Sequence, residues 1–296
     1  METGVVIVGT GLIAKFHEEA VAGIPGLKVV AKLRRGADLD AALSAPGVGL
    51  CLVANASGAH DLPVLAAARH RVPVLVEKPI AITTARVDAM VRACAETATP
   101  LGCIFQTRWS EPFRDLQARV ASGELGRLTY ASIQVPWWRA DEYYTGSDWH
   151  GTKAMDGGGA LINQAIHMVD WLVALMPPVA DVKAFAGTLA HPMEAEDTVS
   201  AAIRFEGGAL GSVYATTASY PGRPRRIEIT GTKGTVVVED AAHGSSHAAA
   251  IPCEQHRACI AAFMESVRGG APYPIDGAEA RKSVDLVERI YRSAQA

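Results

Sequence analysis

Short apolar runs alternate with stretches of helical periodicity along the first third of the chain. The runs are continuously apolar, which is typical of strands buried on both faces of a parallel sheet. The predicted strands are Gly4–Gly9, Leu27–Leu33, Gly49–Ala56 and Val72–Val76, with predicted helices ending near Gly23 and covering 61–70 and 83–97. Little sequence lies between Leu33 and a helix near 38–44, so one strand–helix element is shortened or absent.

The periodicity changes after Cys103. A helix is predicted near 111–122, residues 127–138 alternate like a half-exposed strand, and successive antiparallel strands follow between 179 and 238. Two helices, near 254–267 and 277–294, close the chain. We therefore predict an α/β protein, with a doubly wound parallel sheet in residues 1–104. An α+β domain with a large, mostly antiparallel sheet is predicted in residues 105–296.

Composition and charge exclude several partners. The 296 residues are 49% hydrophobic and 20% charged with a net charge of −3, which gives no electrostatic case for binding nucleic acid or an acidic membrane. No apolar run approaches the length of a membrane span. The five cysteines are Cys51, Cys94, Cys103, Cys253 and Cys259. An odd number without close pairs favours reduced thiols and a cytoplasmic protein.

A glycine-rich turn follows the first predicted strand. Gly9 permits a tight turn, Gly11 allows close approach of a pyrophosphate, and the small Ala14 allows the following helix to pack closely. The amino end of that helix offers unpaired N–H groups to phosphates. The pattern favours dinucleotide binding over an ordinary turn.

Two arginines end the second predicted strand, where NAD-binding folds usually carry an acidic residue. Arg34 and Arg35 cannot accept a hydrogen bond from a ribose hydroxyl, whereas a guanidinium suits a 2′-phosphate. The position favours NADP over NAD. The alternative is that both side chains are solvated surface charges.

The stretch VPVLVEKPI, residues 72–80, brings two opposite charges to the end of an apolar strand. Pro79 disfavours a helical conformation at Lys78, which is therefore held extended. The carboxyl ends of strands are where open α/β sheets bind ligands. A solvated strand end is the alternative.

A long helix is predicted at Met155–Leu175, and most of its surface is apolar. Asn163, His167 and Asp170 follow one another at helical spacing on the remaining stripe. Polar groups on a buried helix need partners or a ligand. A structural histidine with its hydrogen bonds satisfied is the competing interpretation.

Several basic and aromatic side chains precede or follow these motifs without forming a pattern of their own. Arg108, Tyr144, Trp149, His150 and Lys153 are candidates for stacking on a sugar or binding an anion, and Arg108 and Lys153 are retained as substrate contacts. The spacing of Cys253, His256 and Cys259 resembles a metal site, but three ligands at unusual spacing do not support zinc. No metal is predicted.

Taken in order, these segments resemble the Gfo/Idh/MocA family of sugar and polyol oxidoreductases. The matching segments are Gly9–His17, Ala56–His60, Val76–Thr83, Asp156–Asp170, Glu196–Val213 and Arg226–Glu239. The likeness covers nearly the whole chain and is closest to the branch that oxidises UDP-N-acetylglucosaminuronate at its 3-hydroxyl. Ala56 stands where the family often has proline, and the segment Asp240–Pro252 is short.

The resemblance implies a Rossmann domain, a substrate-binding and oligomerisation domain, and hydride transfer between a nicotinamide and a ring carbon. Lys78 matches the family's catalytic lysine, and Asn163 and His167 match its aspartate–histidine pair, with asparagine replacing aspartate. The expected cofactor contacts are Gly9, Thr10, Gly11, Leu12, Ile13, Arg34, Arg35, Asn55, Ser57, His60, Glu77 and Lys78. The expected substrate contacts are Arg108, Lys153, Asn163 and His167. The protein should be a homodimer or homotetramer.

In the mechanism that this implies, His167 accepts the proton of a sugar hydroxyl while Lys78 stabilises the developing alkoxide. Asn163 holds the substrate or the imidazole, and the carboxylate of Glu77 is interpreted as structural. Three alternatives remain open: a non-catalytic dinucleotide sensor, a glycosidase that oxidises its sugar transiently, and reduction of a keto-sugar.

Overall fold

The computed structural model describes residues 2–239 and 253–295, and the chain divides into two compact units. The first comprises Met1–Trp109 and Pro252–Arg281, and the second comprises Ser110–Ile251 and Lys282–Ala296. This division differs from the predicted one in two ways. The first unit extends beyond residue 104, and it also includes the segment Pro252–Arg281 near the end of the chain. The segment Asp240–Pro252, noted above as short, lies outside the described residues.

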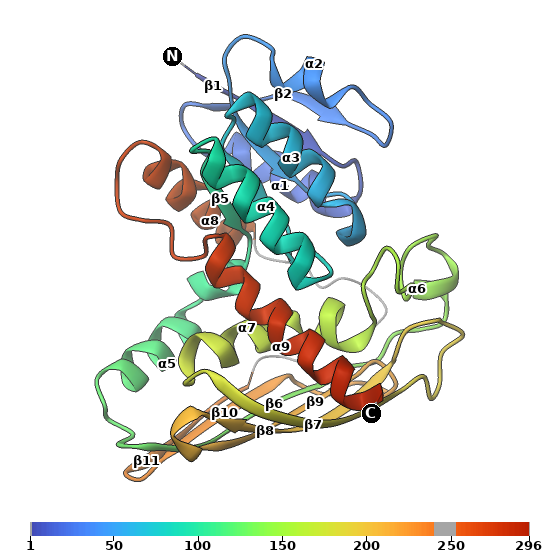
Figure 1. Ribbon diagram of the computed structural model, residues 1–296, viewed down its shortest axis with the longest axis vertical. Coiled ribbons are helices and arrows are strands. Elements are labelled where there is room, and N and C mark those ends of the chain that lie inside the picture. The colour runs from blue at the N-terminus through green and yellow to red at the C-terminus, as the bar shows by residue number, and fades with distance from the viewer. Residues whose placement is uncertain (1, 240–252, 296) are drawn as a thin grey trace. The chain divides into compact units, whose positions relative to one another are not determined.

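The first unit contains a five-stranded, all-parallel sheet in the order β2-β1-β3-β4-β5. Strands β1, β2 and β5 of this sheet are labelled in Figure 1. The strands are β1 (Thr3–Val8), β2 (Leu27–Leu33), β3 (Val48–Val53), β4 (Val74–Val76) and β5 (Leu101–Cys103). The helices are α1 (Leu12–Ala22), α2 (Leu39–Leu43), α3 (Asp61–His70), α4 (Thr84–Glu96) and α8 (Cys253–Val267), with short turns η1 (Ser57–Ala59) and η2 (Gln106–Trp109). The doubly wound architecture is confirmed.

The shortened element predicted after β2 is visible in the sheet order. Only the five-residue helix α2 separates β2 from β3, and β2 is an edge strand with no described strand beyond it. The chain therefore changes direction across β1, which pairs with both β2 and β3. Ligands of open α/β sheets bind at the carboxyl ends of the strands flanking such a switch point.

Residues 253–281, which follow most of the second unit in the sequence, pack inside the first unit. The backbone N–H of Cys103 donates to the Ile275 carbonyl at 2.9 Å, and the Trp109 ring stacks on Tyr273 at 5.8 Å between centroids. Helix α8 also packs against α1. Helical periodicity shows that α8 has a buried face, but it does not show which element covers that face.

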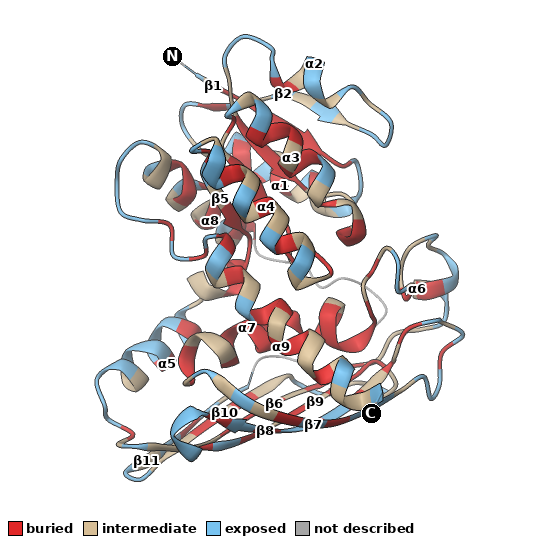
Figure 2. Cartoon of the chain, viewed as in Figure 1, coloured by how far each residue is buried: buried red, intermediate tan, exposed pale blue. Residues whose placement is uncertain are grey.

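The second unit is built on a six-stranded sheet in the order β11-β10-β6-β9-β8-β7, antiparallel except for the pair β6–β9. The strands are β6 (Leu128–Pro136), β7 (Val179–Gly187), β8 (Thr198–Phe205), β9 (Leu210–Thr216), β10 (Arg226–Gly231) and β11 (Gly234–Glu239). Buried and exposed residues alternate along β8, so one face of the sheet is covered and the other is open (Figure 2). This confirms the predicted α+β architecture.

The helices of the second unit are α5 (Glu111–Ala121), α6 (Glu142–Thr145), η3 (Ala160–Gln164) and α7 (Ile166–Leu175), and η4 (Glu206–Gly208) is a short turn. Helix α9 (Gly277–Gln295) begins in the first unit and ends in the second. Within the described ranges, no helix has the length and apolar character needed to span a bilayer. All five cysteines are buried and free.

The predicted continuous helix Met155–Leu175 was wrong in its first half. Turns lead to the π-helical turn η3, and α7 starts only at Ile166. The backbone N–H of Ala165 donates to the carbonyl of Ala160, the i to i+5 bond of a π turn. Gly157 and Gly158 have φ values of +82° and +158°, which a right-handed helix does not use.

Candidate active site

The glycine turn after β1 has the geometry of a ligand cradle. Gly9 has φ +130°, and a Cβ there would collide with the backbone of Ala54, so this position requires glycine. Gly11 precedes α1 with φ −73°, and apart from its own neighbours in the chain no described atom lies within 4 Å of where its Cβ would stand. No side chain caps the first turn of α1, and Leu12 is 55% exposed. This open, uncapped helix start fits the pyrophosphate of a dinucleotide.

A second group lies at the carboxyl end of β3. The Asn55 side-chain N–H donates to the Ala59 carbonyl at 2.9 Å, and Asn55 Oδ1 is buried without a hydrogen-bond partner among the described residues. The His60 ring nitrogens lie 2.9 Å from the Pro79 carbonyl oxygen and 3.1 Å from that of Asn55. Burial lowers the pKa of His60. His60 and the buried Ser57 therefore shape this loop, while Asn55 Oδ1 remains an acceptor for a ligand.

The two arginines after β2 lie on the surface. Arg34 and Arg35 are exposed, and neither guanidinium forms an ion pair with any described residue. The backbone turns immediately afterwards, because the N–H of Ala37 donates to the carbonyl of Arg34 at 3.0 Å. Both side chains are therefore open to solvent and to an anion.

The charged pair after β4 divides into a buried and an accessible residue. Glu77 is 6% exposed, and Lys78 is half-buried. Oxygen Oε1 of Glu77 is 2.8 Å from Nε2 of His17, and Oε2 accepts the backbone N–H of Lys78 at 3.0 Å. We expected Glu77 among the cofactor contacts. The structure shows its carboxylate hydrogen-bonded within the first unit, which agrees with the structural interpretation of this residue.

Arg108, a predicted substrate contact, forms an ion pair inside the first unit. Its guanidinium donates to the Glu279 carboxylate at 3.0 Å, and the Arg108 side chain is 8% exposed. A guanidinium buried against a carboxylate is a poor candidate for a direct anion contact. In the second unit Lys153 is exposed, and its backbone N–H donates to Glu194.

The start of the π turn is held by a carboxylate that the sequence did not suggest. Glu196 accepts the backbone N–H groups of Gly159 and Leu161 at 3.0 Å each, and the Tyr291 hydroxyl donates to it at 2.8 Å. Burial raises the pKa of Glu196, while these hydrogen bonds oppose the shift. The triple-glycine segment lets Glu196 come close, because a Cβ on Gly159 would collide with its backbone.

Helix α7 carries His167 in its first turn. His167 is 8% exposed, and Asp170 on the next turn is fully buried, accepting a bond from the Ser283 hydroxyl at 3.4 Å. Asn163 belongs to the π turn rather than to α7, so it does not lie one regular α-helical turn before His167. The three predicted polar residues therefore do not share one α-helical stripe.

A polar cluster surrounds Asn163, and sequence reasoning missed most of it. The Asn163 amide donates to Asp156 at 2.7 Å, the Arg139 guanidinium donates to Gln164 at 2.8 Å, and Gln164 donates to the Tyr143 hydroxyl at 2.9 Å. Burial lowers the pKa of Arg139 and raises that of Tyr143. No motif marks Arg139 or Tyr143, because they lie in a part of the sequence separate from the π turn that carries Asn163 and Gln164.

Aromatic rings border this cluster. The His150 ring stacks on Tyr143 at 4.3 Å, and Arg139 lies 5.2 Å from the Trp137 ring centroid. Tyr144 is buried, and its hydroxyl donates to Thr217 at 2.8 Å. Of the aromatic candidates, Tyr144 is therefore part of the core.

The suggested metal spacing on α8 does not form one site. The sulfur of Cys259 lies 2.8 Å from the Tyr273 hydroxyl, and that of Cys253 lies near the Phe16 carbonyl. His256 joins a different group with His17 and Glu77, and these three could each offer one ligand atom within a mutual separation of 4.8 Å.

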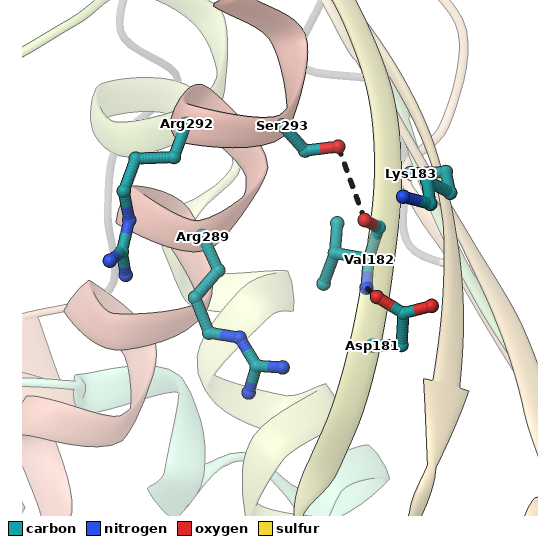
Figure 3. A pocket seen from close by; sticks show the side chains of 6 residues that line it. All are labelled: Asp181, Val182, Lys183, Arg289, Arg292 and Ser293. Atoms are coloured by element: carbon teal, nitrogen blue, oxygen red, sulfur yellow. Dashed lines mark hydrogen bonds between the residues drawn. The ribbon is translucent and has the colours of Figure 1, made fainter. Parts of the chain in front are cut away.

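A separate open hollow in the second unit lies between the end of α9 and strand β7 (Figure 3). It is lined by Asp181, Val182, Lys183, Arg289, Arg292 and Ser293. The Ser293 hydroxyl donates to the Val182 carbonyl, and Arg289 donates to the carbonyls of Val179 and Ala180. None of the predicted site residues lines this hollow.

Comparison with known proteins supports the interpretation of both units. Residues 33–105 match the family model described as "Oxidoreductase family, NAD-binding Rossmann fold", and residues 113–237 match the "GFO/IDH/MocA C-terminal domain". The crystal structure of the WlbA dehydrogenase from Bordetella pertussis, in complex with NADH and UDP-GlcNAcA, is 30% identical. The alignment covers 100% of this chain and 97% of that one, with a TM-score of 0.90. The chain belongs to the Gfo/Idh/MocA family.

Other relatives agree with this assignment. The WlbA dehydrogenase from Chromobacterium violaceum, also in complex with NADH and UDP-GlcNAcA, is 28% identical, covers 99% of this chain and 94% of its own, and has a TM-score of 0.89. D-apiose dehydrogenase from Rhizobium rhizogenes is 25% identical over 88% of this chain and 81% of its own length. The first unit thus contains an NAD-binding Rossmann fold, and the predicted class, an NAD(P)-dependent sugar dehydrogenase or reductase, is confirmed as an NAD-dependent oxidoreductase.

Proposed function

We propose that this enzyme exchanges hydride between a nicotinamide dinucleotide and a ring carbon of a nucleotide sugar that carries a carboxylate. The observation that carries the proposal is the similarity to a dehydrogenase crystallised with NADH and UDP-GlcNAcA, which extends over 100% of this chain and 97% of that one. The polar cluster of the second unit is compatible with an anionic substrate, because the Arg139 guanidinium is bonded to Gln164, which in turn contacts Asn163.

The nicotinamide, when bound, supplies the hydride acceptor or donor. We assign the removal of the hydroxyl proton to His167 and the stabilisation of the resulting oxyanion to the ammonium of Lys78. Asn163 serves as an orienting group, because an amide donates and accepts hydrogen bonds but does not transfer protons. Its bond to Asp156 fixes the amide orientation, and its Oδ1 accepts a longer bond of 3.4 Å from the Gln164 side chain.

The dinucleotide is proposed to lie across the carboxyl ends of β1 and β3, with its pyrophosphate at Gly11 and the start of α1. Asn55 Oδ1, a buried acceptor without a partner, is proposed as a further contact. The proposed donors to the pyrophosphate are the backbone N–H groups at the start of α1, close to Thr10, Leu12 and Ile13.

We further propose that Arg34 and Arg35 bind a 2′-phosphate and favour NADP over NAD. Replacing Arg34 by Asp introduces repulsion with that phosphate, so the preference for NADP should fall by at least about 10-fold. Arg92→Asp applies the same charge change on an exposed face of α4 and should leave the preference intact. Calorimetric titration with NAD and with NADP gives the ratio of their dissociation constants. If this ratio were unchanged in Arg34→Asp, Arg34 would not bind the 2′-phosphate.

Self-association into a dimer or tetramer is proposed through the open face of the six-stranded sheet. Phe185 on β7 is 84% exposed, Leu210 on β9 is 55% exposed and Val237 on β11 is 43% exposed. Light scattering of the wild type and of Phe185→Asp tests this face. The five buried thiols are consistent with the cytoplasmic location that we propose.

The decisive experiment offers the purified enzyme a panel of nucleotide sugars with NAD or NADP and follows nicotinamide absorbance. The proposal expects steady reduction with UDP-linked sugar acids and, in the opposite direction, oxidation with the matching keto-sugar. A sensor would bind dinucleotide without turnover. A glycosidase would release an aglycone from a glycoside with no net absorbance change, and that result would contradict the proposal.

A further inference from the structure

Three buried side chains from separate elements of the first unit converge on one carboxylate. His17 lies on α1, Glu77 directly follows β4, and His256 lies on α8. The His17 and His256 rings meet edge to face, 5.3 Å apart, and both residues are at most 1% exposed. Oε1 of Glu77 is 2.8 Å from Nε2 of His17 and 3.7 Å from Nε2 of His256.

The polar contacts of this trio are directed at the carboxylate. Glu77 Oε1 can only accept while ionised, so His17 donates its Nε2–H to that oxygen. The Nδ1 atoms of His17 and His256 are buried and have no partner among the described residues. Burial alone raises the pKa of Glu77, but the hydrogen bonds and charges of the two histidines outweigh it, holding the pKa well below its usual range.

The other carboxylate oxygen reaches the proposed catalytic residue. Oε2 accepts the backbone N–H of Lys78 at 3.0 Å, and the N–H of Glu77 donates to the Val53 carbonyl at 2.9 Å. The orientation of the carboxylate therefore fixes the peptide that carries the Lys78 side chain. His17 lies on the same helix that the glycine turn opens, so the trio connects the dinucleotide cradle to that peptide.

A metal ion fits the trio less well than this hydrogen-bonded arrangement. Histidines that bind metals donate their second ring N–H to a carboxylate, a carbonyl or water, which fixes the ring. Neither Nδ1 atom has such a partner among the residues that the structure describes. The 2.8 Å separation of His17 Nε2 and Glu77 Oε1 is that of a direct hydrogen bond.

We propose that His17 and His256 are positioning residues that clamp the Glu77 carboxylate. The clamped carboxylate thereby holds the peptide of Lys78 at a fixed position relative to the glycine turn after β1. This inference rests on the proposed catalytic role of Lys78. His17 makes the shorter contact, so it contributes more than His256. A displacement of about 1 Å at a catalytic group can cost on the order of 100-fold in rate.

The test compares His17→Leu and His256→Leu with the corresponding Gln variants, which restore an N–H donor. Both Leu variants should lower kcat by about 10- to 100-fold, with the larger loss at His17, while KM and the NADH Kd change by less than about threefold. The Gln variants should recover most of kcat. His70→Gln is the matched control, because His70 lies 2.8 Å from Asp40 on the surface, and its activity should not change.

Amide hydrogen exchange at Lys78 gives a readout that does not depend on activity. Removing the clamp should speed exchange of this amide by at least about 10-fold in both Leu variants, with protection restored by Gln. If the wild type turned over no substrate, the proposed function would fail, but the exchange rate at Lys78 would still show whether His17 and His256 hold the Glu77 carboxylate. If both kcat and the exchange rate were unchanged in the Leu variants, the proposed positioning role would be wrong. One equivalent of tightly bound metal in the wild type, lost in the Leu variants, would overturn it as well.

Discussion

Gly9 and Gly11 lie in the same turn, yet the chain needs glycine at them for different reasons. At Gly9 the backbone has φ +130°, and a Cβ would collide with Ala54 inside the protein. At Gly11 the conformation suits any residue, and no described residue other than its chain neighbours lies close to the position of the missing Cβ. A structural constraint acts at the first position, and we infer that a ligand constraint acts at the second.

The pair of substitutions Gly9→Ala and Gly11→Ala separates these constraints. Gly9→Ala should destabilise the first unit by at least about 2 kcal/mol, because the collision involves backbone atoms that cannot move independently. Gly11→Ala should change stability by less than about 0.5 kcal/mol but weaken NADH binding at least about 10-fold. Thermal unfolding and calorimetric titration measure the two effects. Full NADH affinity in Gly11→Ala would place the pyrophosphate elsewhere.

Asp197 shows how one buried carboxylate organises a loop of the second unit. Its oxygens accept the backbone N–H groups of Leu189, Ala190 and His191 at 2.7–3.0 Å. Burial alone raises the pKa of Asp197, but these N–H donors lower it below its usual value. Because the folded pKa is depressed, the stabilisation is complete above the unfolded pKa of about 3.9. It is lost as the pH falls through the folded value.

Replacing Asp197 by Asn tests this loop. The amide puts a donor against backbone donors, so the free energy of unfolding at neutral pH should fall by about 2–3 kcal/mol. The difference from wild type should begin to shrink as the pH drops below about 4, since the unfolded chain then takes up a proton at this carboxyl while the folded protein does not. Asp88→Asn, which alters a half-exposed pair with Arg281, should cost less than about 1 kcal/mol. Urea unfolding across this pH range measures both, and a constant difference would refute the assignment.

The segment from the triple glycine to α7 is the element whose details the sequence predicted least well. Apolar periodicity correctly indicated a buried helix ending near Leu175. It could not indicate the π turn, because the bonds of Glu196 to Gly159 and Leu161 come from a residue far along the chain. Local propensity carries no information about such a partner.

A methyl group at Gly159 should disturb this element directly. Gly159→Ala pushes the Glu196 backbone away from the π turn, so stability should fall by about 1–3 kcal/mol. Activity should fall with it, because the same turn leads into His167. Gly234→Ala meets only the Leu125 side chain at 3.6 Å and should be tolerated. Differential scanning calorimetry and initial rates provide the comparison, and wild-type values for Gly159→Ala would contradict this role of Glu196.

At the scale of the whole chain, the two architectures were predictable because continuous and alternating apolarity distinguish parallel from antiparallel strands. The division into units was harder to predict, since the segment Pro252–Arg281 belongs to the first unit although most of the second unit precedes it in the sequence. In the candidate site, too, local features were predictable and contacts between distant segments were not. Lys78 and the glycine turn are encoded by local motifs, whereas the His17–Glu77–His256 trio and the polar cluster at Arg139 arise only when distant segments meet.

We propose that turnover of a sugar hydroxyl requires both Lys78 and His167, whereas dinucleotide binding requires neither side chain. The most direct measurement is the turnover of Lys78→Met and His167→Gln on the best substrate of the nucleotide-sugar panel, alongside NADH titrations of the same preparations. We expect kcat to fall at least about 100-fold in each variant. The NADH Kd should stay within about threefold of wild type. Wild-type turnover in either variant would show that its side chain is not needed for catalysis.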